Sequence, residues 1–310
     1  MKPRMFGKAF SPSGISSFFE TCTHHSNGTI IQDPLQRGAK GGGFALAKGV
    51  LTTVHADPSS STELTVTINN RVEDARTTKT LIKMLLSKQS KSYHIRIDHK
   101  IEVPIGAGFG TSAAGAFSCG LALTAALNLP LTYNKITQVA HVADVICNTG
   151  LGTVEGLATG GLVLVVRSGA IGYGVVDRIP IAPDLKIVAG VFEPIEKTSI
   201  LFSQHKIRLI NKIAQKTMRQ IISNPSSANF MASCKKFAFE SGLASERVKN
   251  LITRAEKAGA IGAAQNMIGE AVHALTSSKH LESVKNAFLK DFSQEDILIS
   301  PIDFMGARLV

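Results

Sequence analysis

A glycine-rich segment that ends in two hydroxyl side chains is the part of the sequence best suited to chemistry. Residues 102–115 read E-V-P-I-G-A-G-F-G-T-S-A-A-G, with glycines at 106, 108 and 110. Glycine lets the backbone bend and lets a bulky anion approach it closely. A helix that begins near Ser112 would point free N–H groups and the positive end of its dipole at that anion. The segment therefore predicts a phosphate-binding loop, in which Thr111 or Ser112 offers a hydroxyl to a metal ion.

Two better-known nucleotide loops do not fit this segment. A P-loop needs a lysine after its last glycine, and the chain has Thr111 there. The G-x-G-x-x-G dinucleotide fingerprint needs its third glycine one position later than Gly110. A glycine-rich turn before a tightly packed helix remains open as the purely structural alternative.

Regular elements on both sides must position this loop. Residues 93–103 alternate apolar and polar, which predicts a half-buried strand, and an alanine-rich helix follows from about Ser112 to Leu127. Thr132 is expected to cap the next helix, which runs to about residue 148. The remaining predicted strands lie over 28–33, 44–55, 62–69 and 186–193, with two short strands within 160–176 on either side of Ser168 and Gly169. The remaining predicted helices lie over 74–88, 204–222, 228–241 and 245–258. A glycine-rich loop is predicted over 34–43, and a loop followed by a helix over 261–276.

Composition limits the function classes. The chain has 310 residues, 44% of them hydrophobic and 18% charged, which is enough for two folded domains. The net charge of +11 attracts an anion such as ATP, a carboxylate or nucleic acid. Lysines and arginines are scattered rather than interleaved with aromatic residues, so we expect no nucleic-acid partner. No apolar run is long enough for a membrane span, and four cysteines without a C-x-x-C pair favour a reduced, cytoplasmic protein.

Residues 104–114, P-I-G-A-G-F-G-T-S-A-A, resemble the second motif of the GHMP kinases, P-x-x-x-G-L-G-S-S-A. Phe109 stands for Leu and Thr111 for the first Ser of that motif. The resemblance implies that the loop wraps the phosphates of ATP and that Ser112 ligates Mg²⁺. It implies ATP-binding roles for Pro104, Gly106, Ala107, Gly108, Gly110, Thr111, Ser112 and Ala113.

Three further segments resemble the archaeal pantoate kinases, in the same order along the chain. They are residues 9–19 (AFSPSGISSFF), 33–43 (DPLQRGAKGGG) and 140–154, which contains AHVAD and TGLGTV; weaker echoes lie at 266–270 and 303–308. The resemblance implies an α+β fold, with a domain like ribosomal protein S5 domain 2 over 1–182 and a ferredoxin-like domain over 183–310. It also implies phosphorylation of the primary hydroxyl of pantoate by ATP, on the archaeal route to coenzyme A. A homodimer is left open.

The same resemblance implies the other site residues, and the chain departs from the family pattern at several of them. Asp144 stands where the family has a metal-binding Glu, and Thr153 stands where it has an Asp thought to be the general base. Glu155, two residues on, is the nearest carboxylate, and it is either a substitute base or only a surface or ion-paired residue. Lys40 replaces an Arg and is expected to hold the substrate carboxylate or the transferring phosphoryl group, as a point charge; Arg37 is the alternative cation in the same loop. The candidate substrate-binding residues are Ser13, Ser16, Arg37, Gly38 and Lys40. The candidate catalytic residues are Lys40, Thr153 and Glu155, and the candidate metal ligands are Ser112 and Asp144.

These departures gather around the acceptor and the base, while the phosphate loop is intact. Three interpretations stay open, in this order: a divergent pantoate kinase, a kinase for a related hydroxy acid, and a nucleotide-binding relative with weak catalysis. Phosphoryl transfer depends mainly on positioning and electrostatics, so the loss of a base does not exclude turnover.

Overall fold

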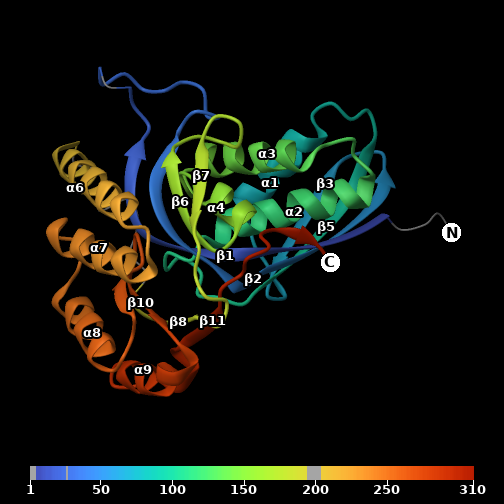
Figure 1. Cartoon of the computed structure of the whole chain (residues 1–310). Coiled ribbons are helices and arrows are strands. Elements are labelled where there is room, and N and C mark those ends of the chain that lie inside the picture. The colour runs from blue at the N-terminus through green and yellow to red at the C-terminus, as the bar shows by residue number, and fades with distance from the viewer. Residues whose placement is uncertain (1–4, 26, 194–203) are drawn as a thin grey trace.

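Two long antiparallel strands form the centre of the larger of two sheets (Figure 1). The computed structural model describes residues 5–25, 27–193 and 204–310. β1 (Met5–Cys22) pairs with β2 (Gly38–Ser59) from Met5 opposite Ala56 to Cys22 opposite Gly38. The sheet has the order β12 (Arg308–Leu309), β1, β2, β5 (Ser92–Ile101), β3 (Glu63–Ile68) and β4 (Arg71–Val72), while β6 (Leu162–Arg167) pairs with β2 and β7 (Val175–Ile179) pairs with β6.

Four helices pack against one face of this sheet. They are α1 (Arg76–Leu86), α2 (Thr111–Leu127), α3 (Tyr133–Ile146) and α4 (Thr153–Thr159). α2 is buried on nearly all sides because it is built of Ala, Gly and Leu, and it packs on Val50, Val54, Ile95 and Ile97 of the sheet in one core. The expected cap at Thr132 is present, since its side chain accepts a hydrogen bond from the Lys135 amide. This helical layer therefore fixes where the N-terminal turns of α2 and α4 lie.

The smaller sheet has four antiparallel strands in the order β11 (Leu298–Pro301), β8 (Lys186–Glu193), β10 (Glu270–Thr276) and β9 (Gly262–Gln265). In chain order this is 4-1-3-2, the arrangement of a ferredoxin-like domain. Its helices are α6 (Gln204–Ser223), α7 (Ser227–Glu240), α8 (Glu246–Lys257) and α9 (Leu281–Phe288), with 3-10 turns at Ser278–His280 and Gln294–Asp296. The predicted α+β class is confirmed. No helix of the described residues is long and apolar enough to cross a bilayer.

Three sequence predictions are corrected by the structure. Residues 261–276 form the hairpin of β9 and β10 instead of a loop and a helix, because both strands are buried on both faces and show no alternation. The glycine run 41–43 lies within β2 instead of a loop, and a Cβ on Gly43 would lie 1.7 Å from the Ile15 carbonyl oxygen. Residues 28–33 contain only an isolated bridge, at Ile30. Glycine was thus required by close strand approach at 41–43, and not by a turn.

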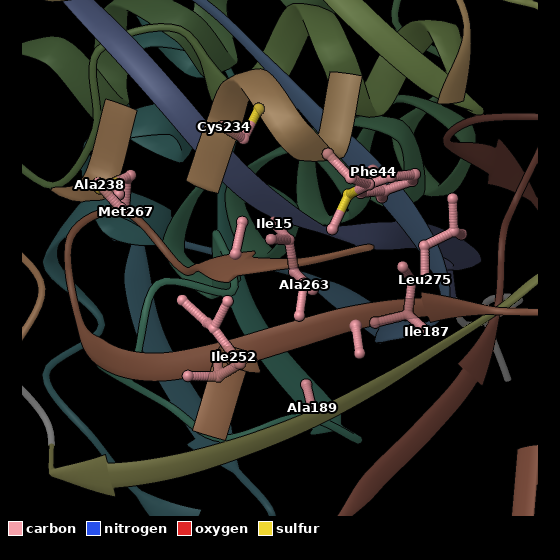
Figure 2. Close-up of a cluster of buried hydrophobic side chains, with 14 of the residues drawn as sticks. Ile15, Phe44, Ile187, Ala189, Cys234, Ala238, Ile252, Ala263, Met267 and Leu275 are labelled. Carbon is pink, nitrogen blue, oxygen red and sulfur yellow. The ribbon is translucent and has the colours of Figure 1, made fainter. Parts of the chain in front are cut away.

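One hydrophobic core joins the two sheets (Figure 2). Ile15 and Phe44, on β1 and β2, belong to the same buried cluster as Ile187 of β8 and Leu275 of β10. The larger sheet's run of strands ends at Ile179 and β8 begins at Lys186, yet the C-terminal strand β12 returns to pair with β1. The division of the chain into domains at 182/183 stays a prediction.

Two buried histidines hold elements together as neutral rings. His99 on β5 contacts the Thr52 hydroxyl (2.7 Å) and the Thr78 hydroxyl on α1 (3.1 Å), while His273 on β10 contacts the Ser17 hydroxyl on β1 (2.9 Å). Burial disfavours the charged ring and lowers the pKa of His99 to about 4 and the pKa of His273 to about 3. Both side chains are therefore uncharged near neutral pH.

We expect acid to destabilise the protein through these two rings. In the unfolded chain their pKa returns to about 6.5, so the unfolded state binds protons that the folded state excludes. The free energy of unfolding is fully retained above pH 6.5 and falls as the pH drops toward 4, by up to about 1.4 kcal/mol per pH unit for each histidine. Denaturant unfolding between pH 6 and pH 5 measures the slope. His99→Gln should make it shallower and the exposed control His25→Gln should not; a flat wild-type profile would contradict the prediction.

Candidate active site

The predicted glycine-rich turn lies between β5 and α2. Gly106, Gly108 and Gly110 have φ angles of +80°, +81° and +62°, in the left-handed region that glycine adopts without steric strain. α2 begins at Thr111, and no side chain caps its first turn. The amides of that turn therefore lack a side-chain acceptor and face the loop together with the positive end of the helix dipole, which is an arrangement that binds an anion.

The turn is fixed by elements from distant parts of the chain. The Gly14 amide of β1 donates to the Phe109 carbonyl at 3.0 Å. A Cβ on Gly110 would lie 2.7 Å from Cγ2 of Thr153, the first residue of α4, and 3.3 Å from the Gly14 carbonyl oxygen. The N-terminal turns of α2 and α4 and the middle of β1 therefore meet at Gly110.

Backbone atoms rather than side chains face the anion position in this turn. The side chains of Ala107 and Ala113 are buried in the two cores. Gly108 lies next to the segment that connects β9 to β10, since a Cβ on Gly108 would lie 3.5 Å from the Met267 carbonyl oxygen. Pro104, Thr111 and Ser112 are partly exposed. The predicted nucleotide contacts of Ala107 and Ala113 are therefore restricted to their main-chain atoms.

A chain of hydroxyl groups connects the two predicted metal ligands. The Ser112 hydroxyl donates to the Thr77 hydroxyl (2.9 Å), which contacts the Thr149 hydroxyl (2.9 Å). The Thr149 hydroxyl donates to Oδ1 of Asp144 (2.6 Å). Ser112 and Asp144 therefore belong to one polar cluster, as expected, but two threonines that the sequence analysis did not single out stand between them.

The donor atoms of this cluster fit a hard divalent cation. Hydroxyl and carboxylate oxygens are the ligands that Mg²⁺ takes in proteins. Across residues 5–25, 27–193 and 204–310 no group of three His, Cys, Asp or Glu side chains could hold a metal ion. An ion at this place would accordingly be held by few protein oxygens together with phosphate and water.

Glu155 does not lie where a substitute base is needed, which corrects that prediction. Its side chain is 1% exposed, and its carboxylate lies 2.8 Å from Nδ1 of His141. The other ring nitrogen of His141 contacts the carbonyl oxygens of Pro34 (3.2 Å) and Arg37 (2.9 Å). Burial alone would lower the pKa of His141, but the Glu155 carboxylate and these two carbonyls raise it. The buried ion pair thus joins α3, α4 and the 34–37 loop, and it offers no base to a substrate.

Lys40 on β2 forms an ion pair with Glu20, which lies near the C-terminal end of β1. Its ammonium group lies 3.2 Å from both carboxylate oxygens of Glu20, which is nearly buried. Gln215 of α6 donates to the same carboxylate at 2.9 Å. Next to this pair, Asn211 of α6 bonds to the backbone of Thr21 in both directions. The smaller domain's first helix therefore sets the position of the lysine.

A cavity of about 390 Å³ opens beside the phosphate turn. Among the described residues that line it, Lys40 is the only one with an ionisable side chain. Most of the remaining wall is apolar, with Ile15, Phe19 and Leu157 among its side chains. Ser16, Lys40 and Thr153 of the predicted site residues line the cavity, which therefore offers one positive charge, a few hydroxyls and an apolar wall.

Three predicted substrate residues do not line this cavity, and these predictions are corrected. The Ser13 hydroxyl is buried and donates to the Lys48 carbonyl (2.7 Å). The Arg37 guanidinium donates to the Gln32 carbonyl (3.0 Å), and Gly38 is enclosed by backbone atoms of Gly169 and Leu151. Ser13 and Gly38 both lie in the long β1–β2 pairing. The motif alone could not show which face of the strands each residue occupies.

The structure also brings in residues that sequence reasoning missed. Thr77, Glu20 and Gln215 come from α1, β1 and α6, and none lies within one of the motif segments, although Glu20 directly follows residues 9–19. Met267 and Ile268 complete the cavity wall from the smaller domain. Of these residues, only Met267 and Ile268 lie in a segment with a sequence signal, the weak family similarity at 266–270. The others belong to no recognisable local pattern.

Known proteins resemble this chain in sequence and in fold. A family model for the GHMP kinases N terminal domain matches residues 76–155. Two curated relatives are pantoate kinases: that of Thermococcus kodakarensis is 26% identical over 91% of both chains, and that of Methanospirillum hungatei is 28% identical over 94% of this chain and 93% of its own. A solved phosphotransferase related to the CoA biosynthesis pathway superposes with a TM-score of 0.85 at 24% identity, covering 99% of each chain.

The fold is therefore that of the GHMP kinases, and residues 76–155 match the N-terminal domain of that family. The curated relatives to which the chain is similar over most of its length are archaeal pantoate kinases. The predicted α+β fold of a GHMP kinase is confirmed.

Proposed function

We propose that this protein is a small-molecule kinase that transfers the γ-phosphoryl group of ATP to the primary hydroxyl of pantoate. One observation carries the proposal: the cavity with a single lysine shares Gly14 and Thr153 with the surroundings of the phosphate turn. An acceptor in the cavity and a triphosphate on the turn would thus be neighbours. The pantoate kinase relatives support the same reaction.

The cavity matches the chemistry of pantoate. Pantoate has one carboxylate, two hydroxyls and a carbon that carries two methyl groups. Lys40 supplies the one positive charge, while Ile15, Phe19 and Leu157 supply an apolar wall for the methyl groups. An acceptor with a second anionic group would find no second cation among the described lining residues. A small monocarboxylic hydroxy acid is therefore the acceptor class that the cavity favours.

Positioning supplies the catalysis in this proposal. No carboxylate belongs to the described lining of the cavity, and Thr153 cannot act as a base near neutral pH. Phosphoryl transfer passes through a loose transition state in which alignment and charge stabilisation dominate. The turn and the first amides of α2 would hold the phosphates, and Lys40 would orient the acceptor. Ser112 and Asp144 would hold Mg²⁺, which neutralises phosphate charge when it is bound.

Incubation with ATP, Mg²⁺ and D-pantoate tests the proposal. We expect 4-phosphopantoate and ADP in equal amounts, detected by ³¹P NMR or mass spectrometry. The methyl ester of pantoate keeps both hydroxyls but lacks the charge that Lys40 would bind, so it should be a poor acceptor. Phosphorylation of another hydroxy acid in place of pantoate would reassign the acceptor. ATP binding without transfer to any acceptor would contradict the proposed function.

A further inference from the structure

The hydroxyl chain between Ser112 and Asp144 has a fixed direction. A hydroxyl has a single proton to donate. The Thr149 proton is used on Oδ1 of Asp144, so Thr149 can only accept from Thr77. The Thr77 proton is then used on Thr149, and Thr77 accepts from Ser112. All three hydroxyl protons therefore point toward Asp144.

This direction determines what the Ser112 oxygen can bind. Its proton is donated to Thr77, so its own lone pairs are left for another group. A cation needs a lone pair, and a hydroxyl whose proton pointed toward it would repel it. Ser112 is the second residue of α2, next to the anion position at Gly110. The chain of hydroxyl groups thus leaves the Ser112 oxygen with lone pairs that can bind the cation of a nucleotide–metal complex.

Thr77 is held rigidly enough to impose the direction. It is 5% exposed and is the second residue of α1. Its neighbour Thr78 contacts His99, and the other nitrogen of that ring contacts Thr52 on β2. The N-terminal turn of α1 is therefore anchored to the sheet through Thr78 and His99, and the Thr52 hydroxyl extends this network to Ser118 on α2. A rotation of Thr77 away from Ser112 would have to disturb this packing.

We propose that Thr77 is a positioning residue for the divalent cation. By accepting from Ser112 and donating to Thr149, it directs the lone pairs of Ser112 toward the ion and links that oxygen to the carboxylate of Asp144. The inference rests on the proposed function, because it requires a nucleotide–metal complex on residues 104–113. Partners that orient a metal ligand in this way typically change metal affinity by about 10- to 100-fold when they are removed.

Mn²⁺ binding tests the role of Thr77 without catalysis. The probe is free Mn²⁺, measured by EPR, in the presence of a non-hydrolysable ATP analogue. Thr77→Val keeps the shape and removes the hydroxyl, and we expect Mn²⁺ to bind about 10- to 100-fold more weakly. Thr77→Ser should restore binding. Thr124→Val is the matched control, because the Thr124 hydroxyl on α2 is buried without a hydrogen-bond partner in the described structure; it should bind Mn²⁺ normally.

A double variant distinguishes the loss of a directed hydroxyl chain from a general disturbance of the fold. Thr149→Val should weaken Mn²⁺ binding as Thr77→Val does, and the combination should be no worse than either alone, since links in series fail together. Additive losses, or Thr77→Val binding Mn²⁺ like wild type, would overturn the role of Thr77 and leave the kinase proposal standing. A wild-type protein that binds neither the analogue nor Mn²⁺ would overturn both.

Discussion

Lys40→Met should raise the KM for pantoate by about 100-fold while the KM for ATP stays nearly unchanged. Lys40 is the only ionisable residue in the described lining of the acceptor cavity. A hydrogen bond to a charged group contributes about 1.5–3 kcal/mol, and each 1.4 kcal/mol changes affinity tenfold. Steady-state kinetics with each substrate varied in turn measures both constants. Lys48→Met lies on the same strand outside the cavity and is the matched control.

Part of this effect comes from the partner that the variant leaves behind. Without Lys40, the nearly buried carboxylate of Glu20 loses its cation and keeps only the amide of Gln215. An uncompensated buried carboxylate would also repel the carboxylate of the substrate. Glu20→Gln in the Lys40→Met background should therefore recover some affinity for pantoate. Equal KM values for pantoate in wild type and Lys40→Met would show that the acceptor carboxylate binds elsewhere.

Much of the fold was predictable wherever one face of an element is buried and the other is exposed. β5 alternates along its length, and α6 and α8 carry a buried stripe under a charged face. The β9–β10 hairpin was missed because Ala263, Ala264 and their neighbours are buried on both faces, which removes the alternation. The four-strand order of the smaller sheet depends on contacts between distant segments and came from the family resemblance alone.

The site divides in the same way. The phosphate turn is a continuous segment whose glycines have a local reason, their positive φ angles, so its position was predictable. Ser13 and Gly38 were transferred from a motif, and Glu155 was chosen as the carboxylate nearest to Thr153. The pairing of β1 with β2 and the ion pair with His141 place all three outside the cavity. Partners such as Thr77 and Glu20 become visible only when the elements that carry them are placed in space.

Gly110→Ala should weaken binding of ATP at least about tenfold. The residue has a φ of +62°, which costs a non-glycine residue about 1–2 kcal/mol, and its Cβ would lie 2.7 Å from Thr153. The turn must shift to relieve that contact, and the N–H groups at the start of α2 then no longer point at the same anion. Gly242→Ala is the matched control, with a φ of +65° and open space around its Cβ, so it should lose stability but no affinity. Calorimetric titration with the ATP analogue gives both affinities; if the two variants bind equally well, the turn at Gly110 does not hold the phosphates.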